Sequence, residues 1–425
     1  MTVDPTLLSL FPASTTVDAD GALEVAGIRL STLADEFGTP VQVVDETALR
    51  QRARDFVDGL TRRRPGSSVA FASKSFPCTA IYRVMAEEDL HIDVAGAGEL
   101  ITALKAGVPA AQIVLHGNAK TDHELGLAVD AGVGTIVIDG WDDISRIERL
   151  DGPPQPVLLR VIPGVDAPTM AAVATGHHGS KFGLALDEAR KAIDHLRSSD
   201  RFDVRGIHVH IGSQILTVDA FAEAVEAVAD LGTFDVYDVG GGLGVRYHRT
   251  DEAPTVDEYL DTITQAASAH LPAAAELWIE PGRSMVAQSA VTLYRVVTVK
   301  RGDQTFVAVD GGIADNMEAS TYVGTRFDAV LADRPANGAP VELVGRQCES
   351  GDLFASDLPL HAPQIGDVVA LPVTGAYTYT LLSNYNGALR PPVVFVRDGS
   401  VKLVVRRETY DELTARDVVG GLLRH

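Results

Sequence analysis

The chain has 425 residues, of which 36 are basic and 58 acidic, so its formal net charge is −22. This length predicts two or three domains, and 46% hydrophobic with 22% charged residues indicates a globular chain. The negative charge argues against nucleic acid and anionic membranes as partners, because both need a basic surface.

The cysteine content and the terminus indicate a cytoplasmic protein. Two cysteines, Cys78 and Cys348, cannot form a disulfide framework. The N-terminus lacks the cationic start and apolar core of a secretory signal, and no window holds about 18 consecutive apolar residues. Seven of the 36 basic residues are lysines, so few candidates exist for covalent lysine chemistry.

Eight short β-type runs recur between residues 69 and 280. The first five start 22 residues apart, and helical patterns that end near glycine separate them. Alternating strands and helices predict a parallel sheet, and eight such units favour a closed (β/α)₈ barrel. The alternative is an open doubly wound sheet, but no G-x-G-x-x-G motif follows any run. The runs are 69–72, 91–94, 113–115, 135–138, 157–161, 206–211, 236–239 and 277–279.

The pattern changes after residue 285, where β-branched runs follow one another without long helices. They occupy 291–300, 305–309, 341–344, 368–373, 393–396 and 401–405, and they predict a mainly β domain. The first 40 residues also contain strand-like pieces, which could pair with this domain. We therefore expect an α/β protein: a barrel at 41–285, and a β domain built from the N-terminal segment 1–40 and the C-terminal segment 286–425.

Polar residues stand at the ends of the predicted barrel strands. In such barrels the carboxyl ends of the strands share one rim, and the chemistry takes place there. The rim would gather Lys74, Asp93, His116, Asp139, Arg160, His210, Ser213, Gly240, Gly241, Gly242, Glu280, Gly282 and Arg283.

Each of these features alone has an ordinary structural explanation, such as a solvated lysine or a tight glycine corner, but together they suggest one cofactor. The glycine run, Ser213 and Arg283 offer donors for a phosphate. A lysine can form a Schiff base with an aldehyde, a carboxylate can keep a pyridine nitrogen protonated, and His210 can stack on a ring. Phosphate, aldehyde and pyridine together describe pyridoxal 5′-phosphate, PLP. His208 and His210 share a strand face, but no further Cys/His cluster completes a metal site, so no metal is expected.

Twelve collinear segments resemble the fold-type III PLP-dependent decarboxylases, most closely the diaminopimelate decarboxylases. They cover residues from about 30 to 410 and read FGTPVQVVDE, FASKSFP, DVAGAGEL, HGNAK, SKFGLAL, HVHIGSQI, DVGGGLGV, IEPGRS, VDGGIADN, CESGD, TGAYTYTLLSNYNG and VVRRET. The resemblance implies an alanine-racemase-like barrel with a β domain. It also implies a homodimer whose active sites combine the barrel of one subunit with the β domain of the other.

The resemblance also implies a role for each motif residue. Lys74 would carry PLP, Glu280 would pair with its pyridinium nitrogen, and His210 would stack on its ring. Cys348 of the partner subunit would donate a proton after CO₂ is lost, and Glu349 of the partner subunit would contact a substrate amine. The implied cofactor-binding set is Lys74, Asp93, His210, Ser213, Gly240, Gly241, Gly242, Glu280, Gly282, Arg283 and Tyr377. The implied substrate-binding set is Arg283, Glu318, Tyr322, Glu349 and Tyr377.

Glu280 bears on the reaction type. The alanine racemases of this fold class place an arginine at this position, which weakens the electron sink, so a carboxylate here favours decarboxylation over racemisation. A non-catalytic PLP-binding or regulatory protein is the alternative from another class, and the presence of Lys74 and Cys348 argues against it.

One position departs from the family pattern. Glu318 stands where diaminopimelate decarboxylases have an arginine that grips the distal carboxylate of the substrate. Three explanations remain open: Arg326 substitutes for that arginine, Glu318 points to solvent, or the substrate lacks a distal carboxylate. In the third case the substrate would be another amine-bearing amino acid, such as lysine, ornithine or a siderophore or natural-product precursor.

Overall fold

The computed structural model describes residues 3–165, 180–319 and 325–418 of the chain. The chain divides into two compact units. The barrel unit comprises Leu49–Arg246 and Glu252–Ala287, and the β unit comprises Met1–Ala48, Tyr247–Asp251 and Gln288–His425.

Eight parallel strands close into a barrel in the order β10-β11-β12-β5-β6-β7-β8-β9. Closure confirms the predicted barrel and removes the open-sheet alternative. Val114, Val137, Leu158, Val236 and Trp278, from five of these strands, form one buried cluster. The strands are β5 Ser68–Ala72, β6 His91–Val94, β7 Ile113–Leu115, β8 Thr135–Ile138, β9 Gln155–Arg160, β10 Phe202–His208, β11 Val236–Asp238 and β12 Glu276–Ile279.

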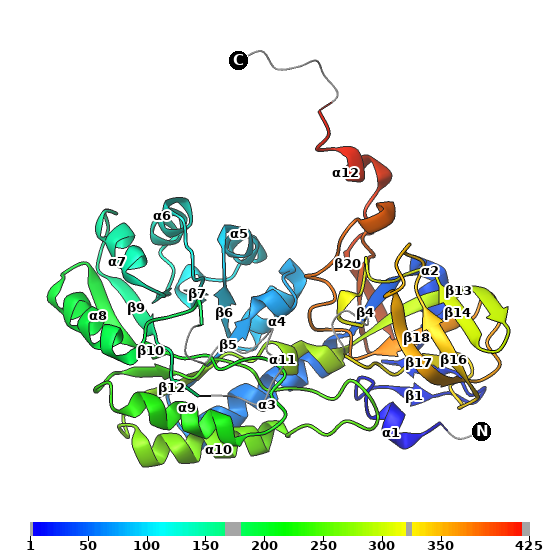
Figure 1. Ribbon diagram of the computed structural model, residues 1–425, viewed down its shortest axis with the longest axis horizontal. Helices are drawn as coiled ribbons and strands as arrows, with labels where there is room; N and C mark the ends of the chain where they lie inside the picture. The colour runs from blue at the N-terminus through cyan, green and yellow to red at the C-terminus, as the bar shows by residue number, and fades with distance from the viewer. Residues whose placement is uncertain (1–2, 166–179, 320–324, 419–425) are drawn as a thin grey trace. The chain divides into compact units, whose positions relative to one another are not determined.

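Helices connect these strands and lie outside them (Figure 1). Two of them begin with a capping box, in which Thr121 with Glu124 and Thr255 with Glu258 satisfy the first backbone N–H groups. The helices of the barrel unit are α3 Glu46–Arg63 (whose first turn lies in the β unit), α4 Thr79–Glu87, α5 Ala97–Ala106, α6 Asp122–Ala131, α7 Trp141–Glu148, α8 Leu186–Ser198, α9 Asp219–Ala229, α10 Val256–His270 and α11 Arg283–Val286, with 3₁₀ turns η1 Ser73–Ser75 and η2 Ala110–Gln112. The 3₁₀ turn η4 Ala287–Ser289 begins at the last residue of the barrel unit and continues into the β unit.

The β unit confirms the predicted mainly β domain. Its large sheet follows the path β17-β16-β14-β13-β4-β19-β20, with β18 on β13 and β15 on β18. The strands are β4 Val41–Asp45, β13 Ala290–Arg301, β14 Thr305–Val309, β15 Val330–Leu331, β16 Ala339–Val344, β17 Leu353–Leu360, β18 Val368–Pro372, β19 Val393–Arg397 and β20 Ser400–Val405. The helical pieces are α1 Pro5–Leu8, α2 Leu30–Phe37, η5 Met317–Ala319, η6 Tyr385–Gly387 and α12 Tyr410–Thr414.

The N-terminal segment joins the β unit. Strands β1 Thr16–Val17, β2 Leu23–Val25 and β3 Ile28–Arg29 form a small sheet, and Leu23 donates its N–H to the carbonyl of Ala332 at 2.7 Å. Strand β4 lies beyond the inferred border at residue 40, yet it pairs with both β13 and β19. All five of its residues are buried, so the β unit depends on β4 for its core.

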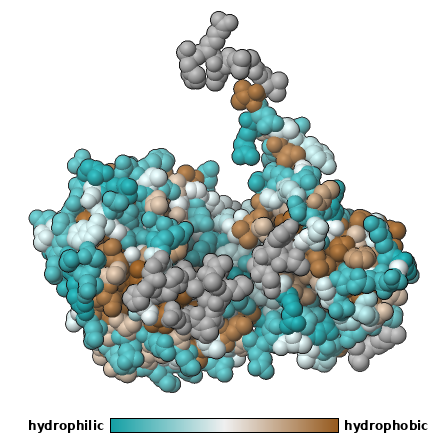
Figure 2. Space-filling view, in the orientation of Figure 1, coloured by the Kyte–Doolittle hydropathy of each residue, from teal (hydrophilic) through white to brown (hydrophobic). Residues whose placement is uncertain are grey.

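Hydrophilic residues cover most of the visible surface of each unit (Figure 2). Within the described parts of the chain, no helix combines the length and the apolar character needed to cross a membrane.

Candidate active site

Lys74 lies on the turn η1, directly after strand β5. Its neighbours Ser73 and Ser75 are buried, whereas Lys74 itself is exposed. Ser75 donates its hydroxyl hydrogen to the carbonyl of Ala72 at 2.8 Å, which fixes this turn on the end of the strand. The amine of Lys74 therefore lies at the carboxyl rim of the barrel, on a turn that is hydrogen bonded to the end of strand β5.

Glu280 follows strand β12 and is buried, with 5% of its surface exposed. Its backbone N–H donates to the carbonyl of Gly240 at 2.8 Å. Its Oε2 lies 3.1 Å from Nε2 of His208, and its Oε1 lies 2.7 Å from Nε2 of His116. Burial would raise the pKa of Glu280, but the two imidazoles outweigh burial and hold it well below the usual value. The carboxylate is therefore ionised.

Two further carboxyl groups of the rim have raised instead of lowered pKa values. Burial raises the pKa of Asp93 to about 6. Burial, with the nearby Glu280 charge, also raises the pKa of Asp238 well above its ordinary value. Three carboxyl groups so close together cannot all ionise readily, and the imidazoles make Glu280 the one that ionises first.

The glycine run that follows strand β11 has backbone conformations and close contacts that a larger residue could not adopt. Gly240 has a φ of +67°, and a Cβ on Gly241 would clash with the carbonyl oxygen of Glu280. Gly240 donates its N–H to Oδ1 of Asp238 at 2.8 Å, and Gly241 donates to Nδ1 of His210 at 3.2 Å. The expectation that the whole run offers free N–H groups is therefore wrong for these two residues; Gly241 instead fixes the His210 ring.

The remaining predicted cofactor residues of the barrel unit lie at the same rim. Ser213 follows His210, and Gly282 precedes α11, which begins at Arg283. A Cβ on Gly282 would contact Ala72, so this loop packs directly on the end of β5 beside Lys74. The barrel unit thus brings together Lys74, Asp93, His210, Ser213, Gly240, Gly241, Gly242, Glu280, Gly282 and Arg283.

A buried oxygen of Glu280 that lacks a hydrogen-bond donor within the described part of the chain shows whether this rim fits PLP. Oε1 of Glu280 is buried and, among the described residues, receives no well-aligned hydrogen bond, although His116 is close. A protonated pyridine nitrogen is the donor that such an oxygen lacks. With an amine on Lys74 and the guanidinium of Arg283 on the same rim, the residues fit the cofactor.

His116, His208 and Glu280 also offer three ligand atoms within 4.8 Å of one another. Two ligands of one metal ion, each about 2.1 Å from it, lie roughly 3 Å or more apart. The 2.7 Å separation between His116 and Glu280 is shorter, and it indicates a direct ion pair.

The predicted residues of the β unit lie on three loops that hydrogen bond to one another. Asp352 accepts N–H bonds from Ile313 at 2.8 Å and from Gln347 at 2.7 Å. Cys348 donates its N–H to Oδ1 of Asn386 at 2.9 Å. Ser383 N–H donates to the carbonyl of Ala314 at 2.8 Å. The loops that carry Glu318, Cys348, Glu349 and Tyr377 are thus held as one assembly.

Glu318 lies on η5 with 6% of its surface exposed, so the explanation that it points to solvent is wrong. Arg326 approaches Oγ1 of Thr250 at 3.3 Å and Oδ1 of Asp251 at 3.4 Å. Tyr322 lies outside the described residues.

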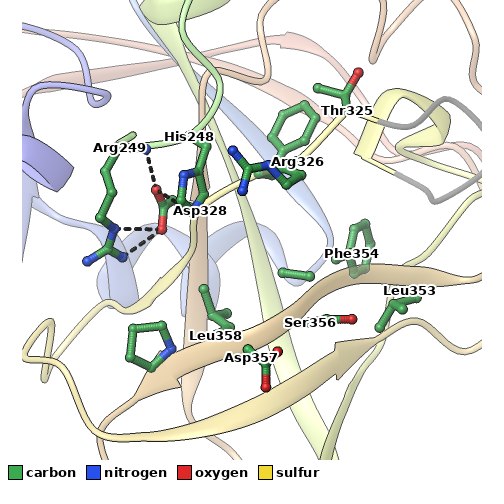
Figure 3. Close-up of a pocket in the computed structure, with 13 residues that line it drawn as sticks. His248, Arg249, Thr325, Arg326, Asp328, Leu353, Phe354, Ser356, Asp357 and Leu358 are labelled. Atoms are coloured by element: carbon green, nitrogen blue, oxygen red, sulfur yellow. Dashed lines mark hydrogen bonds and ion pairs between the residues drawn. The ribbon is translucent and has the colours of Figure 1, made fainter. Parts of the chain in front are cut away.

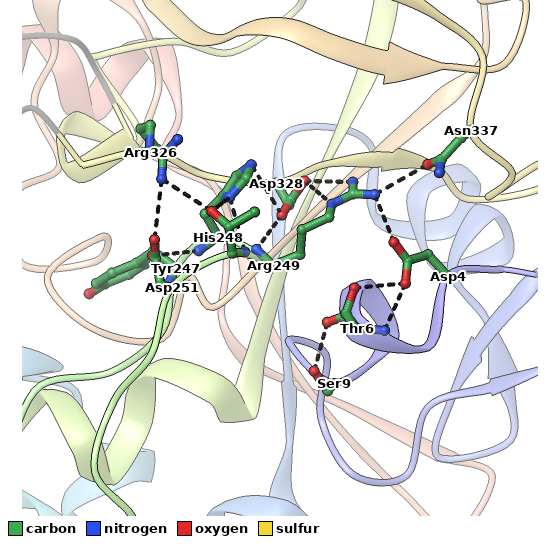
Figure 4. A network of polar contacts seen from close by, with 11 residues as sticks. Asp4, Thr6, Ser9, Tyr247, His248, Arg249, Asp251, Arg326, Asp328 and Asn337 are labelled. Carbon is green, nitrogen blue, oxygen red and sulfur yellow. Dashed lines mark hydrogen bonds and ion pairs between the residues drawn. The ribbon is translucent and has the colours of Figure 1, made fainter.

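Arg326 also lines a cavity of about 490 Å³ within the β unit, between β17 and residues 325–328 (Figure 3). None of the predicted catalytic or cofactor-binding residues lines this cavity. Two of its lining residues form an ion pair: Arg249 binds Oδ1 of the buried Asp328 at 2.6 Å. Arg249 also reaches Asp4 at 3.3 Å (Figure 4). This network ties the N-terminus to the rest of the β unit.

The structure places His116, His208, Arg160 and Asp238 around Glu280. The sequence pattern marks His116 and Arg160 only as strand-end residues, offers His208 only as a possible metal ligand, and gives no role to Asp238. The available signal was spacing: His208 stands two residues before His210, so both side chains leave the chain on the same face.

The chain matches known proteins over nearly its whole length. Residues 47–287 match the family model "Pyridoxal-dependent decarboxylase, pyridoxal binding domain". A diaminopimelate decarboxylase of Actinosynnema pretiosum is 42% identical, over 98% of both chains, and that of Bacillus subtilis is 39% identical, over 94% of this chain and 95% of the relative. The crystal structure of diaminopimelate decarboxylase from M. jannaschii with L-lysine superposes with a TM-score of 0.88 at 29% identity, covering 96% of this chain and 98% of that one.

Proposed function

Because this chain belongs to the pyridoxal-dependent decarboxylases, and is a PLP-dependent carboxy-lyase of the diaminopimelate decarboxylase type, we propose that it converts meso-diaminopimelate to L-lysine and CO₂. The substrate assignment is carried by 42% identity to a diaminopimelate decarboxylase over 98% of both chains. The reaction would be the last step of a lysine biosynthesis.

Bound PLP supplies an electron sink for the negative charge left when CO₂ departs. Lys74 would hold the cofactor covalently through its exposed amine. Glu280, kept ionised by two imidazoles, would hold the proton on the ring nitrogen and so preserve the sink. His210, whose ring is fixed by Gly241, would cover one face of the cofactor ring.

The phosphate would be held by the donors at the glycine-rich rim. Ser213 and Arg283 supply a hydroxyl and a guanidinium, and Gly282 allows the loop that leads to Arg283 to pack closely on β5. Asp93, whose pKa burial raises to about 6, would add a carboxyl group near the cofactor. Gly240, Gly241 and Gly242 would shape the cradle, and Tyr377 would close it.

We also propose a homodimer with shared active sites. Cys348 and Glu349 are both exposed on the β unit, and they would act in the active site of the partner subunit. Cys348 would deliver a proton to the α-carbon after CO₂ leaves, and Glu349 would contact a substrate amine. Arg283, Tyr322 and Tyr377 are further proposed substrate contacts.

Glu318 remains the residue to test for specificity. It is buried at the position of the expected arginine, so the distal carboxylate of the substrate needs another partner. We propose that Glu318 contacts the ammonium beside that carboxylate. If so, Glu318→Gln should raise KM for meso-diaminopimelate about tenfold while leaving PLP binding unchanged.

A substrate panel tests the function. CO₂ release should be fastest with meso-diaminopimelate and at least 100-fold slower with D-lysine, L-lysine and ornithine. A visible absorption band should appear on PLP addition and disappear in Lys74→Ala. Preferred turnover of lysine or ornithine would overturn the substrate assignment, and PLP binding without CO₂ release from any substrate would favour the regulatory alternative.

Two expectations from the sequence stay predictions. Fractionation of the source cells would test the cytoplasmic location. Limited proteolysis would test the domain borders inferred near residues 40 and 285.

A further inference from the structure

We propose that His208 is a positioning residue that anchors Glu280 through Oε2 and leaves Oε1 available to the ring nitrogen of the cofactor. The inference rests on the proposed function and deepens it. It concerns a histidine that lies on strand β10 and is itself not in the cofactor-binding set.

The hydrogen-bonding state of His208 follows from its surroundings. Its side chain is 1% exposed, Nε2 lies 3.1 Å from Oε2 of Glu280, and Nδ1 has no partner among the described residues. A proton on Nε2 can be donated to the carboxylate, whereas a proton on Nδ1 would be buried without an acceptor. Burial also lowers the pKa of His208 to about 4. His208 is therefore a neutral donor, which orients Glu280 without cancelling its charge.

His116 approaches the other oxygen differently. Its Nε2 lies 2.7 Å from Oε1 of Glu280 and 3.7 Å from Oδ1 of Asp93. Burial opposes its charge, but the two carboxylates outweigh burial and raise the pKa of His116. The contact with Oε1 is close but poorly aligned as a hydrogen bond. His116 therefore acts on Glu280 through its positive charge, whereas the hydrogen bond from His208 sets the orientation of the carboxylate.

The two imidazoles also hold each other in place. Their rings meet edge to face, with centroids 4.9 Å apart and planes at 69°. The backbone N–H of His116 donates to the carbonyl of Val94 on β6 at 2.7 Å. His208 ends β10, which pairs with β9 and β11, so both histidines are fixed to barrel strands. The other titratable groups that act on this cluster are Lys74 after β5, Asp93 on β6, Arg160 on β9, His210 after β10 and Asp238 on β11.

The test compares three substitutions of His208 in the full chain. Leu removes the donor, Gln keeps an amide N–H near the position of Nε2, and Asn carries the same amide on a stem too short to reach Oε2. The readouts are the dissociation constant of PLP, the pH dependence of the absorption band of bound PLP, and kcat and KM with meso-diaminopimelate. Circular dichroism and thermal unfolding of the apoprotein establish that each variant folds.

We expect His208→Leu to weaken PLP binding and to lower kcat roughly 10- to 100-fold, with KM within about threefold of wild type. The pH midpoint of the absorption band should also shift. His208→Gln should restore each quantity to within about threefold, and His208→Asn should behave like the leucine variant. A role limited to packing would make Leu and Gln, which are close in volume, behave alike.

His91→Leu is the matched control. His91 begins strand β6, packs on Trp278 with ring centroids 4.9 Å apart, and stands at the opposite end of its strand from the rim. It should leave the absorption band and kcat unchanged.

Equal behaviour of Gln and Asn, or wild-type values in His208→Leu, would overturn the proposal. If the leucine variant does not fold, the comparison of Gln with Asn decides. A wild-type protein that binds PLP but releases CO₂ from no amino acid would refute the proposed function. The PLP dissociation constants and absorption bands of the variants would still test whether His208 positions Glu280.

Discussion

Tyr385 donates its hydroxyl hydrogen to Oε1 of Glu349 at 2.6 Å. The bond links η6 to the loop that carries Cys348, so it fixes a carboxylate that we propose contacts a substrate amine. A hydrogen bond to a charged group contributes about 1.5–3 kcal/mol, and an ordinary one about 1 kcal/mol.

Loss of this bond should loosen Glu349 without unfolding the protein. In Tyr385→Phe we expect KM for meso-diaminopimelate to rise about 3- to 10-fold, with kcat within about twofold. Steady-state kinetics would measure both. Tyr410→Phe, at an exposed tyrosine on α12, serves as the control. An unchanged KM would show that Glu349 is oriented by other contacts.

Asp352 holds two loops together. It accepts N–H bonds from Ile313 and Gln347, and a Cβ on either Gly312 or Gly345 would clash with its carboxylate. Asp352→Ala should therefore destabilise the β unit by about 2–4 kcal/mol, because one buried and one partly buried N–H group lose their acceptor.

Thermal unfolding measures the stability that Asp352→Ala loses. The kcat of this variant should fall as well, because the loop of Cys348 is no longer hydrogen bonded to Asp352. Asp303→Ala, at an exposed aspartate after β13, should leave both quantities unchanged. Wild-type stability in Asp352→Ala would mean that the loops are held elsewhere.

Asp315 gives the β unit a pH dependence. Burial raises its pKa from 3.8 to about 7. A raised carboxyl pKa means that the folded state keeps a proton that the unfolded state has released, so stability falls as pH rises from about 4 to about 7. The full loss is about 4 kcal/mol.

Asp315→Asn should remove that loss. The amide oxygen can still accept the N–H of Gly312, which Asp315 accepts at 2.8 Å, and it carries no charge at any pH. The stability of the variant relative to wild type should therefore rise between pH 4 and pH 7 and stay constant above. Melting temperatures across this range provide the measurement, and a difference independent of pH would contradict the assignment.

Lys120 forms a buried ion pair with Asp143, with 2.7 Å between Nζ and Oδ2. The same ammonium donates to the carbonyl of Gly117 at 2.7 Å, next to His116. Removing one partner of a buried pair leaves an uncompensated charge and costs about 3–5 kcal/mol. We therefore expect Lys120→Met to lower the melting temperature of the barrel unit strongly.

The double variant Lys120→Met/Asp143→Leu should recover most of this stability, because no unpaired charge remains. Additive losses in the double variant would show that the two residues do not act as a pair.

The barrel could be predicted because its signals are local. Runs such as 113–115 and 135–138 are short, apolar and regularly spaced, and each is followed by a helical pattern, so strand order and closure follow from general rules of connection. The placement of β4 could not be predicted in this way. Val41–Asp45 is a buried strand like those of the barrel, and only its pairing with β13 and β19 assigns it to the β unit.

The sequence by itself determined the fold class, the cofactor and the rim residues, because Lys74, His210, the glycine run and Glu280 each follow a strand whose end is fixed by the fold. The tertiary structure alone decided which groups surround Glu280. His208 and Asp238 end β10 and β11, and His116 directly follows β7. Their effect on a carboxylate depends on distances of a few ångströms and on burial. No local pattern encodes such distances, since they arise only when distant strands close into one barrel.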